Sequence, residues 1–401
     1  MPTNAVASVT RSSLTHQHRA DKHSRVGDPK FPHPSAPFDV SAEPTWTGHD
    51  MAITLSPKKA IPRRARRNRK TELFEHDTRT GWMFLAPFVL GLMIFTVIPI
   101  FMAVWVSFTD WSGITPPQRA VSVGLDNYKT LIVDDSLRRS DFALSLKNNF
   151  YYVIFVVPIQ TFLAFVLAVV VHQKFLKGRN FFRLAFFFPS ITSSIAVSLI
   201  FKFMFQVDGL ANAIFPGKKV NWFGNSRGTF HNLLGVFGVD KPPGFMKGSF
   251  FGLTWWDWFA GPSVAMSAIM SSVIWTTSGT LMLIFLGGLQ NIPESLDEAA
   301  TLDGATGWKR MRYITLPMLR PQVYLVLVLG LVGTWQVFDQ IFAMSFGGPD
   351  KSTITPAFWI YFQSFKNGQA GLAAALAVLL CFIIAVFTFV QRMLVSDKGY
   401  D

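Results

Sequence analysis

Long apolar runs alternate with polar segments along the whole second part of the chain. Each run is close to the roughly 20 residues that cross the hydrocarbon core of a bilayer. Only Lys202 and Asp339 interrupt them with a charge. The runs cover residues 82–108, 150–171, 184–205, 263–289, 323–346 and 371–390. One such run could be a buried helix of a soluble domain, but six predict an all-α membrane protein with six transmembrane helices.

The composition supports this reading. Hydrophobic residues make up 50% of the chain and charged residues only 15%, whereas soluble domains carry about 25% charged residues. The single cysteine, Cys381, excludes an internal disulfide and a cysteine-rich metal site. We therefore exclude a disordered protein, a disulfide scaffold and a zinc-ribbon protein.

The positions of the basic residues predict the orientation in the membrane. The net charge is +13, and eight Lys and Arg crowd into residues 58–70, directly before the first apolar run. With the N-terminus inside, inner segments hold 24 basic residues and outer segments 12, as the positive-inside rule requires. Both termini are thus expected in the cytoplasm. We expect the basic block to face anionic lipid and not nucleic acid, because no aromatic platform accompanies it.

The segments outside the apolar runs differ in character. Residues 1–71 lack apolar periodicity and are expected to form a disordered, basic cytoplasmic tail. Residues 72–396 form the membrane domain, and 397–401 a short cytoplasmic tail. No apolar run follows Met1, so no secretory signal peptide is expected, and either Met1 or Met51 could be the true start. The long segments 109–149 and 206–262 are predicted to lie outside and to carry small structured elements.

The inner segment 290–321 predicts a helical hairpin. Asn291 can cap a helix that Pro293 helps to start, and the acidic residues that follow favour its first turn. Gly304 ends this helix. A second, basic helix over 308–315 is closed by Pro317. Physics alone leaves two interpretations open, an amphipathic connector resting in the headgroups or an element that docks another protein.

Three blocks of this hairpin resemble the EAA motif in the permease subunits of bacterial ATP-binding-cassette importers. They are Glu298, Ala299 and Ala300; Asp303, Gly304 and Ala305; and Ile314, Leu316 and Pro317. Further stretches resemble the sugar-permease branch that contains the maltose and glycerol-phosphate permeases: residues 123–128, 182–189, 292–295, 338–339 and 347–349. The resemblance covers about residues 75–395. Met311 replaces the usual Phe, and the 206–262 segment is longer than in most relatives.

The resemblance implies a complete transport machine around this chain. The hairpin would be the coupling helix that docks into a cytoplasmic ATPase dimer, with ATP and Mg bound by that partner and no cofactor bound here. A second permease subunit would complete a heterodimer, and an extracellular solute-binding lipoprotein would deliver a sugar, such as a disaccharide or oligosaccharide. The location would be the bacterial inner membrane, in contact with lipid. The chain itself would not be an enzyme: Gly217 and Lys218 lack the upstream glycine of a P-loop.

Two polar clusters near mid-membrane are the candidate substrate path. Trp275, Thr276, Thr277 and Ser278 lie in the fourth run, and Trp335, Gln336 and Asp339 share one face of the fifth at i,i+3 and i,i+4 spacing. Aromatic faces suit the C–H surfaces of a sugar, and amides, hydroxyls and carboxylates suit its hydroxyls. Ser193 and its neighbours after Pro189 either bend a helix or line the path. Lys202 is expected to snorkel outward.

Other functions remain open at this point. A glycerol-phosphate-type ester is the alternative cargo, although few basic residues face the path. A proton-coupled secondary transporter would use Asp339 as its proton site. A membrane sensor or scaffold without flux is the third class. ATP dependence of uptake separates these hypotheses.

Overall fold

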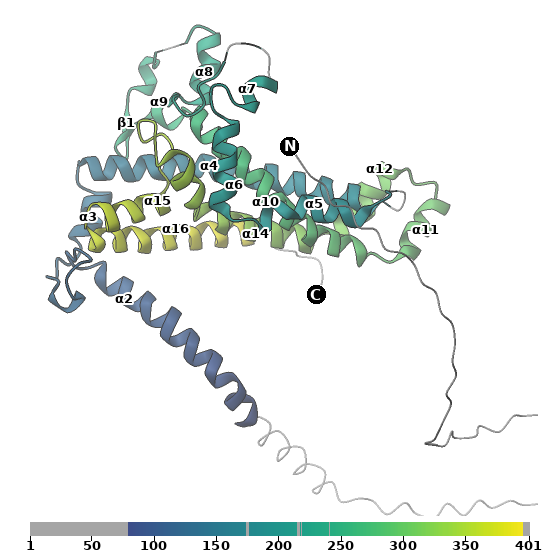
Figure 1. Cartoon of the computed structure of the whole chain (residues 1–401), viewed down its shortest axis with the longest axis horizontal. Helices are drawn as coiled ribbons and strands as arrows, with labels where there is room; N and C mark the ends of the chain where they lie inside the picture. The colour runs from purple at the N-terminus through teal and green to yellow at the C-terminus, as the bar shows by residue number, and fades with distance from the viewer. Residues whose placement is uncertain (1–78, 174–175, 215–216, 218, 240, 396–401) are drawn as a thin grey trace, which may run out of the picture. The chain divides into compact units, whose positions relative to one another are not determined.

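The structure, a computed structural model, describes residues 79–173, 176–214, 217, 219–239 and 241–395 (Figure 1). The expected disordered tail 1–71, the alternative start at Met51 and the tail 397–401 lie outside the described residues. Within them, four single helices are long and apolar enough to cross a membrane: Arg79–Val106, Leu137–His172 (α4), Val264–Gln290 (α10) and Ala370–Leu394 (most of α16, Ala370–Val395). They coincide with the first, second, fourth and sixth apolar runs.

The third apolar run contains a sharp bend between two helices, and a second bend precedes the fifth run. Arg179–Ile191 (α5) and Ser194–Met204 (α6) meet at 97°. Gly307–Met318 meets Arg320–Trp335 (α14) at 66°. The bend expected after Pro189 is therefore a complete break, and the continuous helix expected over 323–346 is wrong, because α14 ends at Trp335. Figure 1 shows α6 crossing the direction in which α4, α5 and α10 run.

Side-chain hydrogen bonds explain the break between α5 and α6. Pro189 lies inside α5 and lacks a backbone N–H. The hydroxyls of Ser190 and Thr192 donate to the carbonyl oxygens of Phe187 and Phe188 at 2.7 and 3.1 Å, and such bonds compete with the helix ladder. Thr192 then adopts an extended backbone, φ −71° and ψ 150°, from which α6 starts in a new direction.

Helix α4 is the centre of the bundle. It packs against α10 along much of its length and also against α14 and α5. The core along these helices is made of buried aliphatic, methionine and aromatic side chains, with Tyr152, Met266, Ile269 and Phe285 fully buried. Helix α16 packs against another side of the bundle. Its Leu372–Leu376 region belongs to one buried cluster there, and Trp335 of α14 belongs to a second cluster that α16 also joins. The first helix contacts α16 through its final part, Ile98–Val106 (α2).

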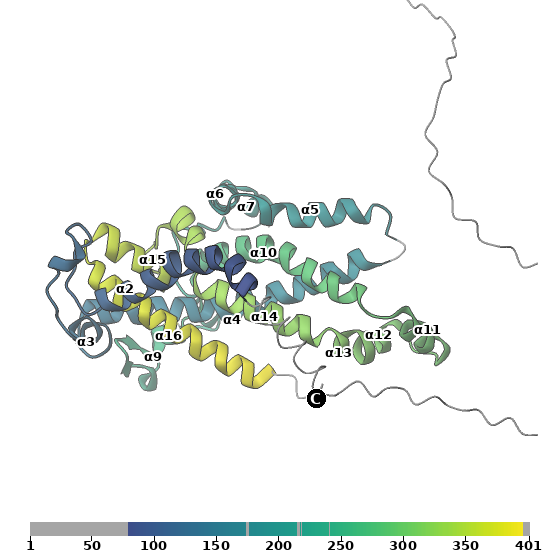
Figure 2. The same ribbon diagram turned by 90° about the horizontal axis from the view of Figure 1, so that it is seen from below.

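Short elements complete the described chain. Within helical segments, π-helical turns occur at Met93–Val97, Met311–Thr315, Ile341–Ser345 and Phe362–Lys366, and 3-10 turns at Pro117–Arg119 and Gly244–Met246. The remaining helices are Asp126–Ile132 (α3), Leu210–Ile214 (α7), Thr229–Val236 (α8), Trp255–Trp258 (α9), Glu294–Leu302 (α11), Gly307–Arg310 (α12), Leu316–Met318 (α13) and Pro356–Tyr361 (α15). Two strands, Ser249–Phe250 (β1) and Leu253–Thr254 (β2), pair antiparallel. Figure 2 shows α11–α13 at one end of the bundle and α3 at the other.

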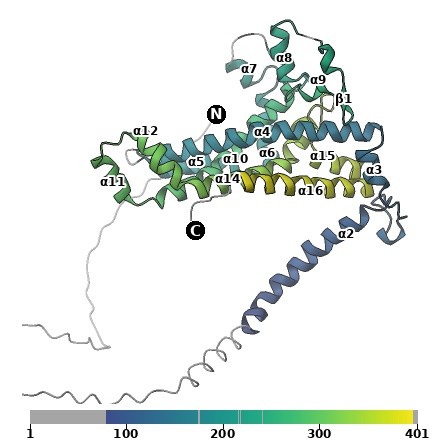
Figure 3. The same ribbon diagram turned by 180° about the vertical axis from the view of Figure 1, so that it is seen from behind.

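Residues 206–262, which we call the cap, hold the short elements from α7 to α9 and lie beside α4 (Figure 3). The Tyr151 hydroxyl donates to the carbonyl oxygen of Trp258 at 2.7 Å, and the Ser140 hydroxyl to that of Gly252 at 3.3 Å. In α9, Thr254 and Asp257 form a capping box. The small structured elements expected in this segment are present, and hydrogen bonds to α4 hold them in place.

A turn over residues 346–353 ties the cap to the bundle. Phe346, Asp350 and Lys351 all have positive φ, which is uncommon for residues other than glycine. The Lys351 ammonium pairs with Asp141 of α4 at 2.7 Å, and the Ser226 hydroxyl of the cap hydrogen-bonds to Asp350 at 2.9 Å. The turn follows directly on the π-helical turn after α14, so it joins the cap to the segment that follows α14.

Acidification should loosen the cap through His231. Its ring stacks on Trp256 at 4.2 Å, and its Nε2 hydrogen-bonds to the Trp256 carbonyl oxygen at 3.1 Å. Burial, aided by nearby Arg227 and Lys147, lowers the pKa of His231 against the opposing effects of Trp256 and Asp257. A lowered pKa favours the neutral ring. The contribution of His231 to stability is therefore complete above its pKa in the unfolded chain, about 6.5, and is lost as pH falls through its lower pKa in the folded protein.

Thermal unfolding of the purified chain in mild detergent, followed from about pH 8 to pH 5, checks this expectation. The wild type should lose more stability on acidification than His231→Gln, which cannot titrate in this range. Parallel curves for the two proteins would contradict the role of His231.

Candidate functional site

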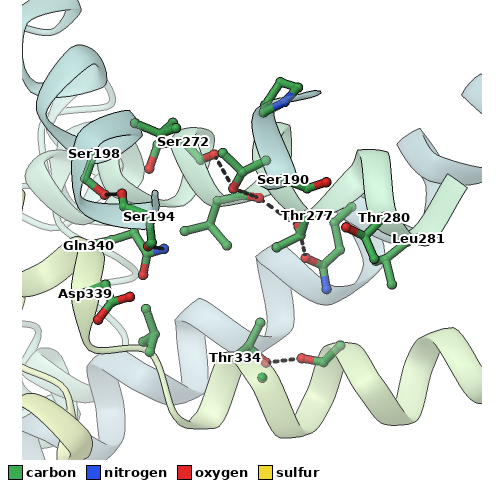
Figure 4. Close-up of a pocket in the computed structure, with 18 of the residues that line it drawn as sticks. Ser190, Ser194, Ser198, Ser272, Thr277, Thr280, Leu281, Thr334, Asp339 and Gln340 are labelled. Atoms are coloured by element: carbon green, nitrogen blue, oxygen red, sulfur yellow. Dashed lines mark hydrogen bonds between the residues drawn. The ribbon is translucent and has the colours of Figure 1, made fainter. Parts of the chain in front are cut away.

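A cavity of about 490 Å³ lies where the broken helices meet α4 and α10. Its walls come from the α5–α6 break, from the middle of α10 and from the last turns of α14 with the residues that follow. Figure 4 shows Asp339 and Gln340 facing Ser194 and Ser198 of α6. The break between α5 and α6 and the end of α14 at Trp335 both border this cavity.

Thr276 and Thr277 of α10 and Gln336 and Asp339 after α14 line this cavity. These four are the sequence-predicted residues that the fold brings together. They come from two segments far apart in the chain, as the two-cluster prediction expects. Whether they contact a substrate stays a prediction.

The other predicted path residues lie outside the lining. Trp275 is 45% exposed on another face of α10, and the buried Ser278 hydroxyl donates to the Trp275 carbonyl oxygen. Ser193 precedes α6 without lining the cavity, although Ser190, Thr192 and Ser194 line it. The expected bend thus occurs in this stretch, and three of its hydroxyls line the cavity, while their place on a substrate path stays a prediction.

Trp335 shows why the shared face predicted for the fifth run is wrong. It is buried at 2% exposure, and its ring packs 5.1 Å from that of Phe387 in α16. The helix ends at Trp335 and Gln336 caps it, so the 3.6-residue period no longer relates Trp335 to Asp339. Trp335 therefore faces the core of the bundle and Asp339 the cavity.

Lys202 also departs from expectation. Its ammonium donates to the carbonyl oxygen of Ala343 at 3.4 Å and does not snorkel away from the bundle. Nearby, the Gln340 amide donates to the Ser194 hydroxyl at 3.0 Å. These two bonds hold α6 against the segment that follows α14.

Several lining residues were not predicted from the sequence: Tyr152, Gln160, Ser198, Ser272, Thr280, Thr334 and Gln340. Gln160 is the one that the sequence does signal, because it is an amide inside the apolar run 150–171, where polar side chains are usually functional. It is 1% exposed, and its Oε1 accepts from Thr277 at 2.6 Å. The bond joins α4 to α10 across the cavity wall.

Most lining hydroxyls have already donated their proton within the protein. Seven of them donate to carbonyl or amide oxygens at 2.6–3.1 Å, namely Ser190, Thr192, Ser198, Ser272, Thr276, Thr277 and Thr334. A hydroxyl has one proton and two lone pairs, so these groups offer only lone pairs to the cavity. Tyr152 differs, because its hydroxyl is buried and has no hydrogen-bond partner among the described residues.

The hairpin over 290–319 is a second candidate site, at one end of the bundle (Figure 2). Gly304 has φ +69°, and it separates α11 from α12. The Ala305 N–H donates to the Ala300 carbonyl oxygen at 2.9 Å, and Arg310 pairs with Asp297 at 3.7 Å. The helix–glycine–helix geometry is thus closed by bonds between its two arms.

Two details of the expected hairpin are wrong. Asn291 caps the end of α10, while Pro293 itself occupies the N-cap of α11. Pro317 does not close the second helix, because a helical segment runs through it to Met318 and the chain bends at Leu319.

The hairpin exposes large apolar side chains. Leu302 is 89% exposed, Trp308 72% and Tyr313 71%. Glu298 and Asp303 are exposed beside them, whereas Ala300 is buried. Exposed aromatic and leucine side chains rimmed by charge are typical of a surface that contacts a protein or a membrane. The described residues thus contain a polar cavity within the bundle and a partly apolar, exposed hairpin at its end.

Comparisons with known proteins agree with this architecture. The chain is 30% identical to the probable ABC transporter permease protein YesP of Bacillus subtilis, over 80% of this chain and 92% of that protein. It is also 30% identical to the multiple sugar-binding transport system permease protein MsmF of Streptococcus mutans, over 78% of this chain and 93% of that protein.

A solved structure shares the fold. It is a bacterial alginate ABC transporter in complex with an alginate pentasaccharide-bound periplasmic protein, and one of its chains matches with a TM-score of 0.56 at 20% identity, over 80% of this chain and 96% of that one. Residues 138–399 match the family described as binding-protein-dependent transport system inner membrane component. The chain belongs to this family of transport-system inner membrane components.

Proposed function

We propose that this chain is a permease subunit of an ATP-driven importer that moves a sugar, of disaccharide or oligosaccharide size, across a bacterial inner membrane. The observation that carries the proposal is the cavity lined with hydroxyls and amides inside the bundle of an inner membrane transport component. Relatives named for multiple sugars, lactose and arabinooligosaccharides support the cargo class.

The proposed arrangement has six spans with both termini in the cytoplasm. Each bent pair then counts as one span, beside the four single helices. The excess of basic residues in the inner segments supports this orientation. In this arrangement the hairpin would lie on the cytoplasmic side and α3 on the outer side, since α11–α13 and α3 lie at opposite ends of the bundle.

The hairpin is proposed to dock into a cytoplasmic ATPase dimer, which binds and hydrolyses ATP with Mg. The side chains proposed to set the docking geometry are Glu298, Ala299, Ala300, Asp303, Gly304, Ala305, Ile314, Leu316 and Pro317. The exposure of Leu302, Trp308 and Tyr313 supports a protein partner at this end. This chain would contribute no catalytic site and no cofactor of its own.

Transport would follow from a two-state movement of the bundle. Closure of the ATPase dimer would push on α11 and α12. The helical segment that begins with α12 continues through a 66° bend into α14. Helix α14 ends at the cavity wall, so a force at the hairpin reaches Gln336 and Asp339 along one segment. Such rocking between two states is the usual basis of alternating access. A second permease subunit and an extracellular solute-binding protein complete the proposed complex.

Purification of the chain from its native membrane in mild detergent, with mass spectrometry of its partners, tests the proposal. We expect an ABC ATPase, a second permease and a solute-binding lipoprotein. Uptake by vesicles with a panel of neutral sugars should then require ATP. Recovery of the chain alone, with uptake that follows the proton gradient, would instead favour a secondary transporter that uses Asp339.

A further inference from the structure

The cavity wall carries negative charge without positive charge. Its lining contains one carboxylate, Asp339, and within the part of the chain that the structure describes no Lys, Arg or His lines it. Lys202 of α6 does not line the cavity, and its ammonium donates to the carbonyl oxygen of Ala343 and not to Asp339. The negative charge of Asp339 is therefore not balanced by a cation in the wall.

The Asp339 carboxylate has no partner among the residues that the structure describes. No hydrogen bond or ion pair joins its carboxylate to another of the described residues, and the side chain is only half-buried. Its neighbour Gln340, by contrast, is engaged with Ser194. Both carboxylate oxygens of Asp339 are thus available to whatever enters the cavity (Figure 4).

The hydrogen bonds within the protein also leave the wall richer in acceptors than in donors. Seven lining hydroxyls already donate within the protein, as described above, and present only lone pairs. Few donors in the wall have no acceptor among the described residues: the hydroxyls of Tyr152, Ser194 and Thr280, the amides of Gln160 and Gln336, and the second N–H of the Gln340 amide. Lone pairs therefore outnumber free donor hydrogens along the wall.

This wall suits one class of sugar and opposes another. Every hydroxyl of an uncharged sugar carries a proton that it can donate to these lone pairs. An ionised carboxylate or phosphate only accepts, so in this cavity it would lose its water without gaining donors, and it would face Asp339 besides. The solved transporters that share the fold import the acidic polysaccharide alginate, so the fold alone does not decide this choice.

We infer that the cavity admits uncharged sugars and excludes anionic ones, such as uronates and sugar phosphates, and that Asp339 is the residue that sets this selection. The inference rests on the proposed function for its cargo class, but the charge selection of the cavity is a property of this chain's own wall. It also decides against the glycerol-phosphate-type cargo that the sequence leaves open.

The charge selection can be measured with thiol probes in the assembled transporter, without knowing the sugar. The natural chain has one cysteine, Cys381, and Cys381→Ser gives a background free of thiols. Thr280→Cys then reports from the α10 wall and Ser190→Cys from the α5 wall. The probes are two methanethiosulfonates of similar size, one carrying a trimethylammonium group and the other a sulfonate. Leu233→Cys on the cap, 59% exposed, is the matched control outside the cavity.

The ratio of cationic to anionic labelling rates should be at least about tenfold higher in the cavity than at Leu233→Cys, since one nearby charge acts oppositely on the two probes. Asp339→Asn should bring the cavity ratio to within about twofold of the control and leave the control unchanged. Equal ratios at the two places would overturn the inference. So would a cavity ratio that Asp339→Asn does not alter, or cavity cysteines that neither probe labels.

A transport measurement links this property to cargo. Galactobiose and digalacturonate differ chiefly in charge, and we expect Asp339→Asn to improve competition by digalacturonate relative to galactobiose by about tenfold in the uptake assay. Equal competition by both sugars in the wild type would overturn the inference alone. Failure of every neutral sugar to be taken up with ATP, with the thiol ratio as expected, would overturn the proposed function alone.

Discussion

Replacing Gly304 by valine is expected to reduce ATP-driven uptake to below about a tenth of the wild-type rate while the chain still inserts in the membrane. Gly304 has φ +69° at the junction of α11 and α12, and a side chain there costs about 1–2 kcal/mol in the left-handed region. A β-branched residue fits that region worst. Relief of the strain would rotate α11 relative to α12 and misplace the proposed docking surface.

Two control variants test whether the loss of uptake comes from the backbone conformation at Gly304 or from any change of a hairpin glycine. Asn visits the left-handed region more readily than other residues, so Gly304→Asn should keep most of the uptake. Gly307→Ala changes a glycine of the same hairpin that has ordinary backbone angles and open space around its Cβ position. Insertion is followed by the amount of chain in the membrane fraction. Wild-type uptake by Gly304→Val would remove the basis for a coupling role of this turn.

Replacing Gly279 by valine is expected to destabilise the bundle strongly. A Cβ at Gly279 would overlap the carbonyl oxygen of Phe186, and the Cα of Phe187 would lie 3.2 Å away, so α10 and α5 touch here through their backbones. Overpacking of a rigid core costs about 1–3 kcal/mol, and a backbone neighbour cannot rotate away. We expect the unfolding temperature in detergent to fall by about 5 °C or more.

Gly287→Ala is the matched control for this change. It lies in the same helix, with no atom near its Cβ position, and alanine favours a helix by about 1 kcal/mol over glycine. The two variants should therefore shift the unfolding temperature in opposite directions. A Gly279→Val protein as stable as the wild type would show that the contact between α5 and α10 is looser than the structure has it.

The positions of the long helices follow from the sequence, because run length and lack of charge are local properties. The first, second, fourth and sixth runs each contain a helix within a few residues of the expected bounds, except that α4 starts earlier, at Leu137. The glycine turn of the hairpin is also local, since Gly304 and the flanking caps lie within one short segment. Such features need no knowledge of neighbours.

The cavity could not be derived in the same way. Gln160 and Thr277 are 117 residues apart, and no spacing in the sequence relates them. The expected partnership of Trp335 with Asp339 relied on a continuous helix, but the apolar run continues past the point where α14 ends. Hydrophobicity persists across a helix break, so apolar pattern alone does not show where a helix stops.

The break between α5 and α6 has a consequence for how this protein is made. The two helices have 13 and 11 residues, about 20 and 17 Å at helical rise, and neither crosses a hydrocarbon core of about 30 Å by itself. The backbone at Thr192 and Ser193 also needs protein or water partners, because lipid supplies none. This pair of helices cannot leave the insertion machinery for lipid as soon as it is translated. We therefore expect it to stay beside that machinery until the cap has been synthesised and α10 arrives, so that it enters lipid together with α10.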